Sequence, residues 1–277
     1  MEFDVSIMEE AVSLYRINQI ISYGTKSLKL DGVIHNDDIF GLVEFNNVSF
    51  KYNKVPILKN VSFVVKPNEL TAIVGKTGSG KTTIFNLLLR MYRVGKGQIL
   101  IDKLDIYDYS KDVFNSNISI VNQKTFIFNM SIRANLSLID SNKKRQIDAC
   151  KRVGIHDFMM SLPDGYSTIL KDDATNMSGG QKQLLSLARA LLTSSEIILL
   201  DEVTSSLDPR TTDKIIKLLD DLKTDHTIII ITHNKDLMRK ADKLIVLNNG
   251  KVECIGKNDD LIKTNNFYKQ LVIKNSD

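Results

Sequence analysis

The sequence predicts an α/β fold whose sheet is mostly parallel, with an antiparallel edge and a helical insertion. Short, continuous apolar runs at residues 197–200, 228–231 and 244–247 are typical of strands that are covered on both faces. Segments with helical spacing alternate with these runs, and this alternation favours parallel pairing through helical crossovers. Residues 125–192 have helical spacing over most of their length, so we expect them to interrupt the sheet as a helical subdomain.

Composition indicates a folded globular chain. The 277 residues contain 37 Lys and Arg against 33 Asp and Glu, a formal net charge of +4, and 43% of them are hydrophobic, which is enough to fill a core. The longest apolar runs fall well short of the roughly 18 residues of a membrane-spanning helix. Two cysteines, Cys150 and Cys254, are too few for a disulfide framework or a zinc site. The only tight basic cluster is at residues 143–145, so we expect no nucleic-acid partner.

Residues 1–40 differ in pattern from the rest of the chain. Apolar residues recur at helical spacing up to Ile21, and Gly24 ends the pattern before a polar stretch. We therefore expect an N-terminal helix and a linker here. Residues 41–272 are expected to form one domain, followed by a short tail at 273–277.

Strands of this domain are expected in a definite order along the chain. The first half contains strand patterns at 42–50, 61–65, 70–74, 98–102 and 118–121, and the second half contains the three buried runs already named. The turn Asn248-Asn249-Gly250 predicts a hairpin with residues 251–256, which would supply the antiparallel edge. Helical spacing is clearest around 147–153 and 184–192.

A glycine-rich motif follows the predicted strand 70–74 and precedes an apolar helix. It reads Gly75-Lys76-Thr77-Gly78-Ser79-Gly80-Lys81-Thr82, the G-x-x-x-x-G-K-[ST] pattern of a phosphate-binding loop. Glycines allow successive backbone N–H groups to point at phosphate oxygens, and the lysine adds a charge for the β- and γ-phosphates. The Thr82 hydroxyl is suited to Mg²⁺. The predicted nucleotide-binding residues of this segment are Gly75, Thr77, Gly78, Ser79, Gly80, Lys81, Thr82 and Thr83.

Two acidic residues, Asp201 and Glu202, end the buried strand 197–200. A carboxylate at the end of a strand near a phosphate loop can hold Mg²⁺ through water, and we expect this of Asp201. The next carboxylate can accept a proton from an attacking water, which is the expected role of Glu202.

A third motif, Met177-Ser178-Gly179-Gly180-Gln181, opens the helical segment 184–192. A serine and two glycines at a helix start offer a hydroxyl, free backbone N–H groups and the positive end of the helix dipole. Together, the three motifs resemble those of the ATP-binding-cassette (ABC) ATPases, over residues 41–272. The resemblance implies a P-loop NTPase core of the RecA type, with ATP and Mg²⁺ as ligands.

Further site residues follow from this resemblance. Tyr52 would stack on adenine, Gln123 would reach Mg²⁺ and water, and His233 would touch the γ-phosphate. In this family two ATP-binding domains close head to tail, so a second domain, identical or paralogous, is expected as a partner. The residues expected to face that second domain's ATP or its interface are Ser178, Gly179, Gly180, Gln181 and Asp208.

Residues 125–136 and 162–166 resemble exporter subunits more than importer ATPases. The resemblance thus implies a domain that hydrolyses Mg-ATP at the cytoplasmic face of the plasma membrane and drives export through a transmembrane partner. Residues 1–40 would then be the end of the exporter's membrane region; the alternative is a surface helix of a standalone ATPase subunit. The transported substrate cannot be read from these residues.

Two alternatives stay open at the level of sequence. A soluble ABC ATPase of DNA repair or translation uses the same motifs, but repair-type members have a long coiled-coil insertion and translation-type members have two cassettes. This chain has neither pattern. A regulatory module that binds ATP without hydrolysing it is less consistent with the presence of both Glu202 and His233.

Overall fold

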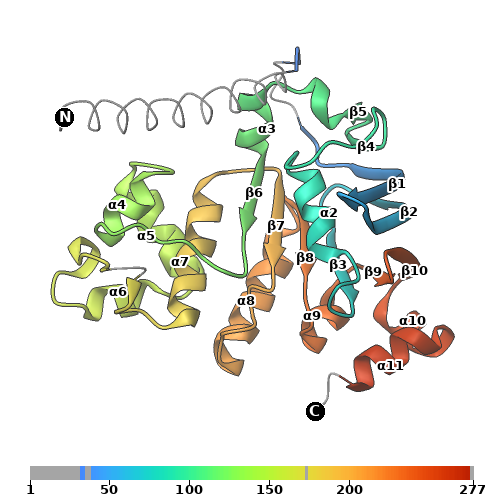
Figure 1. The fold of residues 1–277 in the computed structure, drawn as a ribbon. Coiled ribbons are helices and arrows are strands. Elements are labelled where there is room, and N and C mark those ends of the chain that lie inside the picture. The colour runs from blue at the N-terminus through green and yellow to red at the C-terminus, as the bar shows by residue number, and fades with distance from the viewer. Residues whose placement is uncertain (1–31, 35–38, 172–173, 275–277) are drawn as a thin grey trace, which may run out of the picture.

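The structure is a computed structural model that describes residues 32–34, 39–171 and 174–274 (Figure 1). The helix expected before Gly24, most of the linker and the end of the tail lie outside these residues. Within the described ranges, no helix is both long enough and apolar enough to cross a bilayer.

The central sheet has six strands in the order β10-β9-β3-β8-β7-β6. Neighbours from β9 to β6 are parallel, whereas β10 pairs antiparallel with β9. This confirms the predicted parallel sheet with an antiparallel edge. The strands are β3 (Leu70–Gly75), β6 (Ile118–Val121), β7 (Ile197–Asp201), β8 (Thr227–Ile231), β9 (Lys243–Asn248) and β10 (Lys251–Gly256).

A second, antiparallel sheet has the order β2-β1-β4-β5. Its strands are β1 (Val43–Tyr52), β2 (Val55–Val65), β4 (Ile99–Ile101) and β5 (Leu104–Asp105). Strand β2 begins six residues before the predicted 61–65 run, because residues 55–60 are mostly exposed and therefore lack an apolar pattern.

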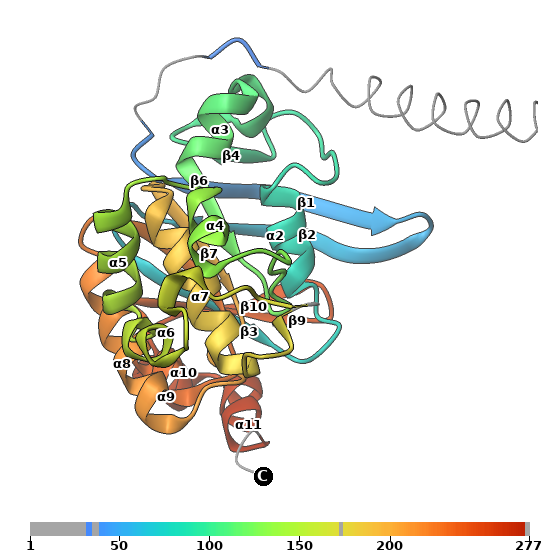
Figure 2. The same ribbon diagram turned by 90° about the vertical axis from the view of Figure 1, so that its left-hand side faces the viewer.

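Helices α4 to α7 gather beside β6, on the side of the molecule away from β1 and β2 (Figures 1 and 2). They fall within the stretch 125–192, as the predicted helical insertion requires. The α-helices are α2 (Lys81–Leu88), α3 (Lys111–Asn117), α4 (Ile132–Ser137), α5 (Lys143–Arg152), α6 (His156–Ser161), α7 (Gly179–Leu192), α8 (Pro209–Leu222), α9 (Lys235–Lys240), α10 (Asn258–Thr264) and α11 (Asn266–Lys274), and the 3₁₀ turns are η1 (Ile106–Asp108) and η2 (Gly165–Ser167).

Two apolar cores lie on the opposite faces of the central sheet. Alternate residues of one strand enter different cores: Ile198 and Leu200 pack with the helical side, whereas Ile197 and Leu199 pack with α2 and the antiparallel sheet. Burial of both faces explains why these strands are continuously apolar rather than alternating. The rigid sheet fixes the position of the loops that follow its strands.

Asn135 fixes the loop between β6 and α4. Its side chain is fully buried, its Oδ1 accepts from Phe128 N at 3.0 Å, and its Nδ2 donates to the carbonyl oxygens of Phe128 and Ser131 at 3.0 and 3.1 Å. One buried amide therefore bonds both the N–H and the carbonyl oxygen of Phe128 and ties this loop to the first turn of α4.

We expect Asn135→Ala to lower the free energy of unfolding in urea by about 1–3 kcal/mol, because it removes three hydrogen bonds of a buried amide and leaves the N–H of Phe128 without its Asn135 partner. Asn176→Ala is the matched control, since Asn176 is exposed and, among the residues that the structure describes, its side chain makes only one long bond, from Nδ2 to Ile169 O at 3.4 Å. Equal effects of the two substitutions would contradict this account of the loop.

Candidate functional site

Four neighbouring strands, β3, β8, β7 and β6, end at the same edge of the central sheet. The phosphate loop follows β3, His233 follows β8, and Gln123 follows β6. Asp201 and Glu202 lie at the end of β7. The parallel arrangement thus brings together side chains that are up to about 160 positions apart in the sequence.

The phosphate loop needs its first glycine for close packing. A Cβ at Gly75, whose φ is +156°, would lie 2.4 Å from the carbonyl oxygen of Leu247 in β9. At Gly78, by contrast, a Cβ would meet open space. The hydroxyl of Ser79 is buried and has no hydrogen-bond partner in the described part of the chain. An unpaired buried hydroxyl beside an open backbone turn, at the start of α2, fits an anionic ligand such as a phosphate.

Lys81 lies across this loop. Its Nζ donates to the carbonyl oxygens of Gly75 at 2.8 Å and Lys76 at 3.1 Å. Burial lowers the pKa of Lys81, while the nearby carboxylates of Glu202 and Asp201 act in the opposite direction. A phosphate group placed here would supply further negative charge and favour the charged lysine.

Glu202 has two side-chain partners from the adjacent strand ends. Gln123 Nε2 donates to its Oε2 at 2.6 Å, and His233 Nε2 lies 3.3 Å from its Oε1. The backbone of Glu202 is left-handed, with φ +49°, and its N–H donates to Ile231 O at 2.9 Å. This conformation is unfavourable for a residue with a side chain and is held by the surrounding turn.

Burial and neighbouring charges shift the pKa values of His233 and Asp201 in opposite directions. Burial, and next the charge of Lys81, lower the pKa of His233, with Glu202 acting against them. The imidazole is therefore neutral at pH 7 and can donate Nε2–H to Glu202. Burial, followed by the charge of Glu202, raises the pKa of Asp201, and Lys81 opposes this. The site thus holds two neighbouring carboxylates, a partly dehydrated cation and a neutral histidine.

Tyr52, the predicted adenine contact, lies at the end of β1 in a cluster of three aromatic rings. Its ring centroid is 4.9 Å from those of Phe50 and Tyr92, and its hydroxyl accepts from Asn86 Nδ2 of α2 at 3.3 Å. Tyr52 is thereby tied to the helix that begins at the phosphate loop. Tyr92 and Asn86 belong to none of the sequence motifs, because their partnership with Tyr52 depends on tertiary packing.

Ser178 caps α7. Its Oγ accepts from Gln181 N at 3.2 Å, and Gln181 Oε1 accepts from Ser178 N at 2.8 Å, which is a complete capping box. A Cβ at Gly180 would approach Ser206 O to 2.9 Å, so the first turn of α7 packs closely on the segment after Glu202. This end of α7 lies apart from the phosphate loop of the same chain, with β7 and β8 between them (Figure 1).

The other predicted residues differ in accessibility. Thr77 and Thr82 are exposed, whereas Thr83 is buried among the first residues of α2. Asp208 is the N-cap of α8, and hydrogen bonds from the side chain and backbone of Thr211 lower its pKa. In the described residues, no group of three or more His, Cys, Asp or Glu side chains forms a metal cage. A Mg²⁺ ion, which commonly keeps water and phosphate ligands, does not require one.

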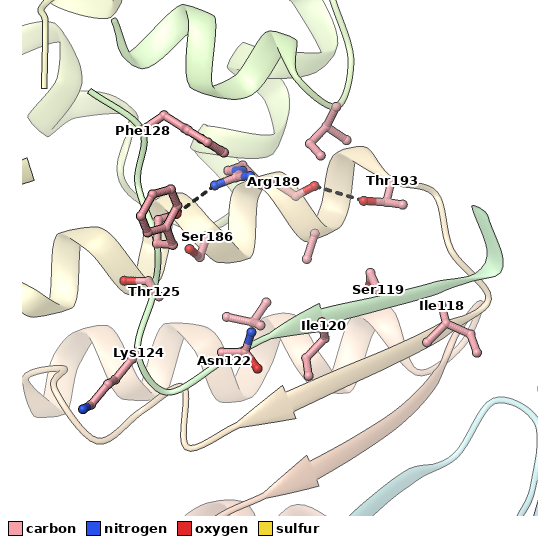
Figure 3. A pocket seen from close by; sticks show the side chains of 14 residues that line it. Ile118, Ser119, Ile120, Asn122, Lys124, Thr125, Phe128, Ser186, Arg189 and Thr193 are labelled. Atoms are coloured by element: carbon pink, nitrogen blue, oxygen red, sulfur yellow. Dashed lines mark hydrogen bonds between the residues drawn. The ribbon is translucent and has the colours of Figure 1, made fainter. Parts of the chain in front are cut away.

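A separate cavity of about 400 Å³ lies between β6 and α7 (Figure 3). Arg189 of α7 donates to Phe126 O at 3.1 Å and lies over the ring of Phe128. Asn122 and Lys124 also line this cavity, while the side chain of Gln123 between them reaches Glu202. One short segment therefore contacts both the cavity and the sheet edge that bears Glu202.

The family model of the ABC transporter matches residues 58–205, which is more than half of the chain. The chain belongs to the ABC transporter family. It is 41% identical over 237 residues to a putative ABC transporter ATP-binding protein of Mycoplasma genitalium, covering 84% of this chain and 40% of that protein. It is 35% identical over 268 residues to an ATP-dependent lipid A-core flippase of Syntrophus aciditrophicus, covering 96% and 45%.

The structure also matches that of a bacterial Atm1-family ABC exporter with ATP bound. The TM-score is 0.83 at 32% identity, and the match covers 89% of this chain and 43% of the exporter chain. Both the P-loop fold and the ATP-binding domain predicted from the sequence are thus confirmed. The chain spans less than half the length of these relatives.

We expect Gly75→Ala to lower the free energy of unfolding more than Gly78→Ala. The first substitution forces a Cβ against a backbone carbonyl of β9, whereas the second costs only the left-handed conformation, about 1 kcal/mol. Urea unfolding of the full chain without nucleotide compares the two directly. An equal loss in both variants would contradict the close packing of the loop against β9.

Proposed function

We propose that this chain hydrolyses Mg-ATP as the nucleotide-binding domain of an ABC exporter and drives export through a transmembrane partner. The observation that carries the proposal is the placement of Glu202 between Gln123 and His233, at the sheet edge that also bears the phosphate loop. The names of the relatives, an ATP-binding transporter protein, a flippase and an exporter, favour this function over DNA repair or translation.

Phosphate binding is assigned to the loop and the start of α2. Backbone N–H groups from Gly75 to Lys81 would surround the phosphates, and the unpaired Ser79 hydroxyl would donate to one of them. The Lys81 ammonium would exchange its carbonyl partners for the β- and γ-phosphates. Tyr52 would then offer a ring face to the adenine.

Glu202 is the proposed general base. Its carboxylate would accept the proton of the attacking water, with Gln123 orienting that water and His233 donating to the base or to the γ-phosphate. Thr82, Asp201 and Gln123 are the residues proposed to hold Mg²⁺, which would neutralise charge that develops on the phosphates. Burial and the charge of Glu202 raise the pKa of Asp201, and a divalent cation bound here would favour its charged form.

A second nucleotide-binding domain is proposed to complete each site. Ser178, Gly179 and Gly180 lie at the start of a 14-residue helix and are exposed or partly exposed. They can therefore contact an anion that is not bound by the phosphate loop of their own chain. Gln181 supports this helix start through the capping box, and Asp208 would lie at the interface between the two domains.

The cavity of Figure 3 is the proposed contact for the membrane partner. Phe126 is 66% exposed and forms a perpendicular pair with Phe128 at its rim, so the cavity offers apolar surface. Because Gln123 lies between two residues that line the cavity, movement there can be transmitted to Glu202. Residues 1–40 are proposed to come from the membrane region, which would keep the domain at the cytoplasmic face of the plasma membrane.

Glu202→Gln should reduce ATP hydrolysis by the full chain by roughly 10²–10⁴-fold while leaving ATP binding intact, because the amide cannot accept the proton. Phosphate release and nucleotide binding measure the two effects. Glu196→Gln is the matched control, since Glu196 lies just before the opposite end of the same strand, β7. Hydrolysis by Glu202→Gln at the parental rate would exclude Glu202 as the base.

ATP should induce dimers of the Glu202→Gln variant in size-exclusion chromatography, because bound ATP is retained at the interface. Adding Ser178→Arg should return the protein to monomers by blocking the helix start, whereas Ser161→Arg, at an exposed serine of α6, should not. A Glu202→Gln variant that stays monomeric with ATP at all concentrations would contradict the head-to-tail arrangement.

A further inference from the structure

We propose that Gln183 is a positioning residue for Glu202, linking the helix that begins at Ser178 to the proposed base of the same chain. This inference rests on the proposed function. Gln183 lies in the second turn of α7 and is only 4% exposed. Its role cannot be predicted from a local sequence pattern, because its partner lies on a different element.

The side chain of Gln183 contacts the backbone of Glu202 directly. Its Nε2 lies 3.5 Å from Glu202 O and 3.5 Å from Ser205 Oγ. Ser205 itself donates to Glu202 O through its hydroxyl at 2.9 Å and its backbone N–H at 3.1 Å. Three donors therefore converge on one carbonyl, in the turn where Glu202 has a left-handed backbone.

The geometry of Gln183 is incomplete. Both Nε2 contacts are at the long limit of a hydrogen bond, and Oε1 is buried with no hydrogen-bond partner among the described residues. A buried amide that is only partly satisfied is costly, and such groups need an explanation in function or strain. A small displacement of α7 toward Glu202 would shorten the two Nε2 contacts. The turn at Glu202 would then be constrained by stronger hydrogen bonds.

The first turn of α7 has little freedom to move without Glu202 being affected. Gly180 packs against Ser206 O so closely that a Cβ would come to within 2.9 Å of it. Ser206 immediately follows the Ser205 that holds the Glu202 carbonyl. Engagement of Ser178 by an anion would therefore act on the turn of Glu202 through Gln183 and the 205–206 segment.

The expected consequence concerns turnover rather than binding. Gln183→Met removes the amide but keeps the length of the side chain, and it should lower kcat of the full chain about tenfold or more while KM for ATP changes less than about twofold. Gln146→Met is the matched control. Gln146 is also buried, but its Nε2 donates to Ser137 Oγ and to Asp140 O in the helical region. This variant should therefore be less stable than the parent chain but keep the parental kcat.

A double-mutant cycle tests whether Gln183 acts through Glu202. In a Glu202→Gln background, adding Gln183→Met should leave the residual rate within about twofold, because there is no base left to position. A general structural defect would lower the rate by the same factor in both backgrounds, and that result would overturn the proposal. Ser205→Ala, which removes another donor to the same carbonyl, should reproduce the loss of kcat if Gln183→Met does not fold.

Failure of this inference is distinguishable from failure of the proposed function. If the parent chain hydrolyses ATP and Glu202→Gln does not, while both Gln183→Met and Ser205→Ala keep the parental kcat, Gln183 has no positioning role. If the parent chain itself does not hydrolyse ATP with Mg²⁺, the proposed function fails and this inference fails with it.

Discussion

The structure depends on the convergence of four parallel strand ends at one edge of the central sheet. Strands β3, β8, β7 and β6 are buried on both faces, so their ends cannot shift without disturbing one of the two cores. That rigidity allows the Gln123 amide to lie 2.6 Å from Glu202 and the His233 ring 3.3 Å from it. These side chains can then form one site, although each follows a different strand.

Glu202 joins this edge to the rest of the domain. Its carboxylate faces the strand ends, its N–H is bonded to β8, and its carbonyl is bonded to the turn that supports α7. The same residue therefore lies between the phosphate loop and the first turns of α7. In the proposed cycle, ATP held by a second copy would act on α7, and the turn at Ser205 would carry the effect to the base.

Much of this arrangement could be predicted from the sequence, because it depends on local patterns. The glycine-lysine motif, the acidic end of β7 and the capped start of α7 each have a short signature, and the continuous apolar runs indicate a parallel sheet. Their common edge follows from strand direction alone. The start of β2 could not be predicted, since its first residues are exposed and carry no periodic signal. Gln183, Asn86 and Tyr92 were also missed, because their partners are set by packing between distant elements.

The most direct test of this account is a crystal structure of the Glu202→Gln variant with Mg-ATP. The account predicts two copies related head to tail, with the phosphates between the loop Gly75–Thr82 of one copy and Ser178 of its partner. The substituted side chain at position 202 should face the γ-phosphate, and Gln183 Nε2 should lie closer than 3.5 Å to the backbone carbonyl oxygen of that position. Phosphates bound away from that loop, or a nucleotide-loaded monomer, would contradict it.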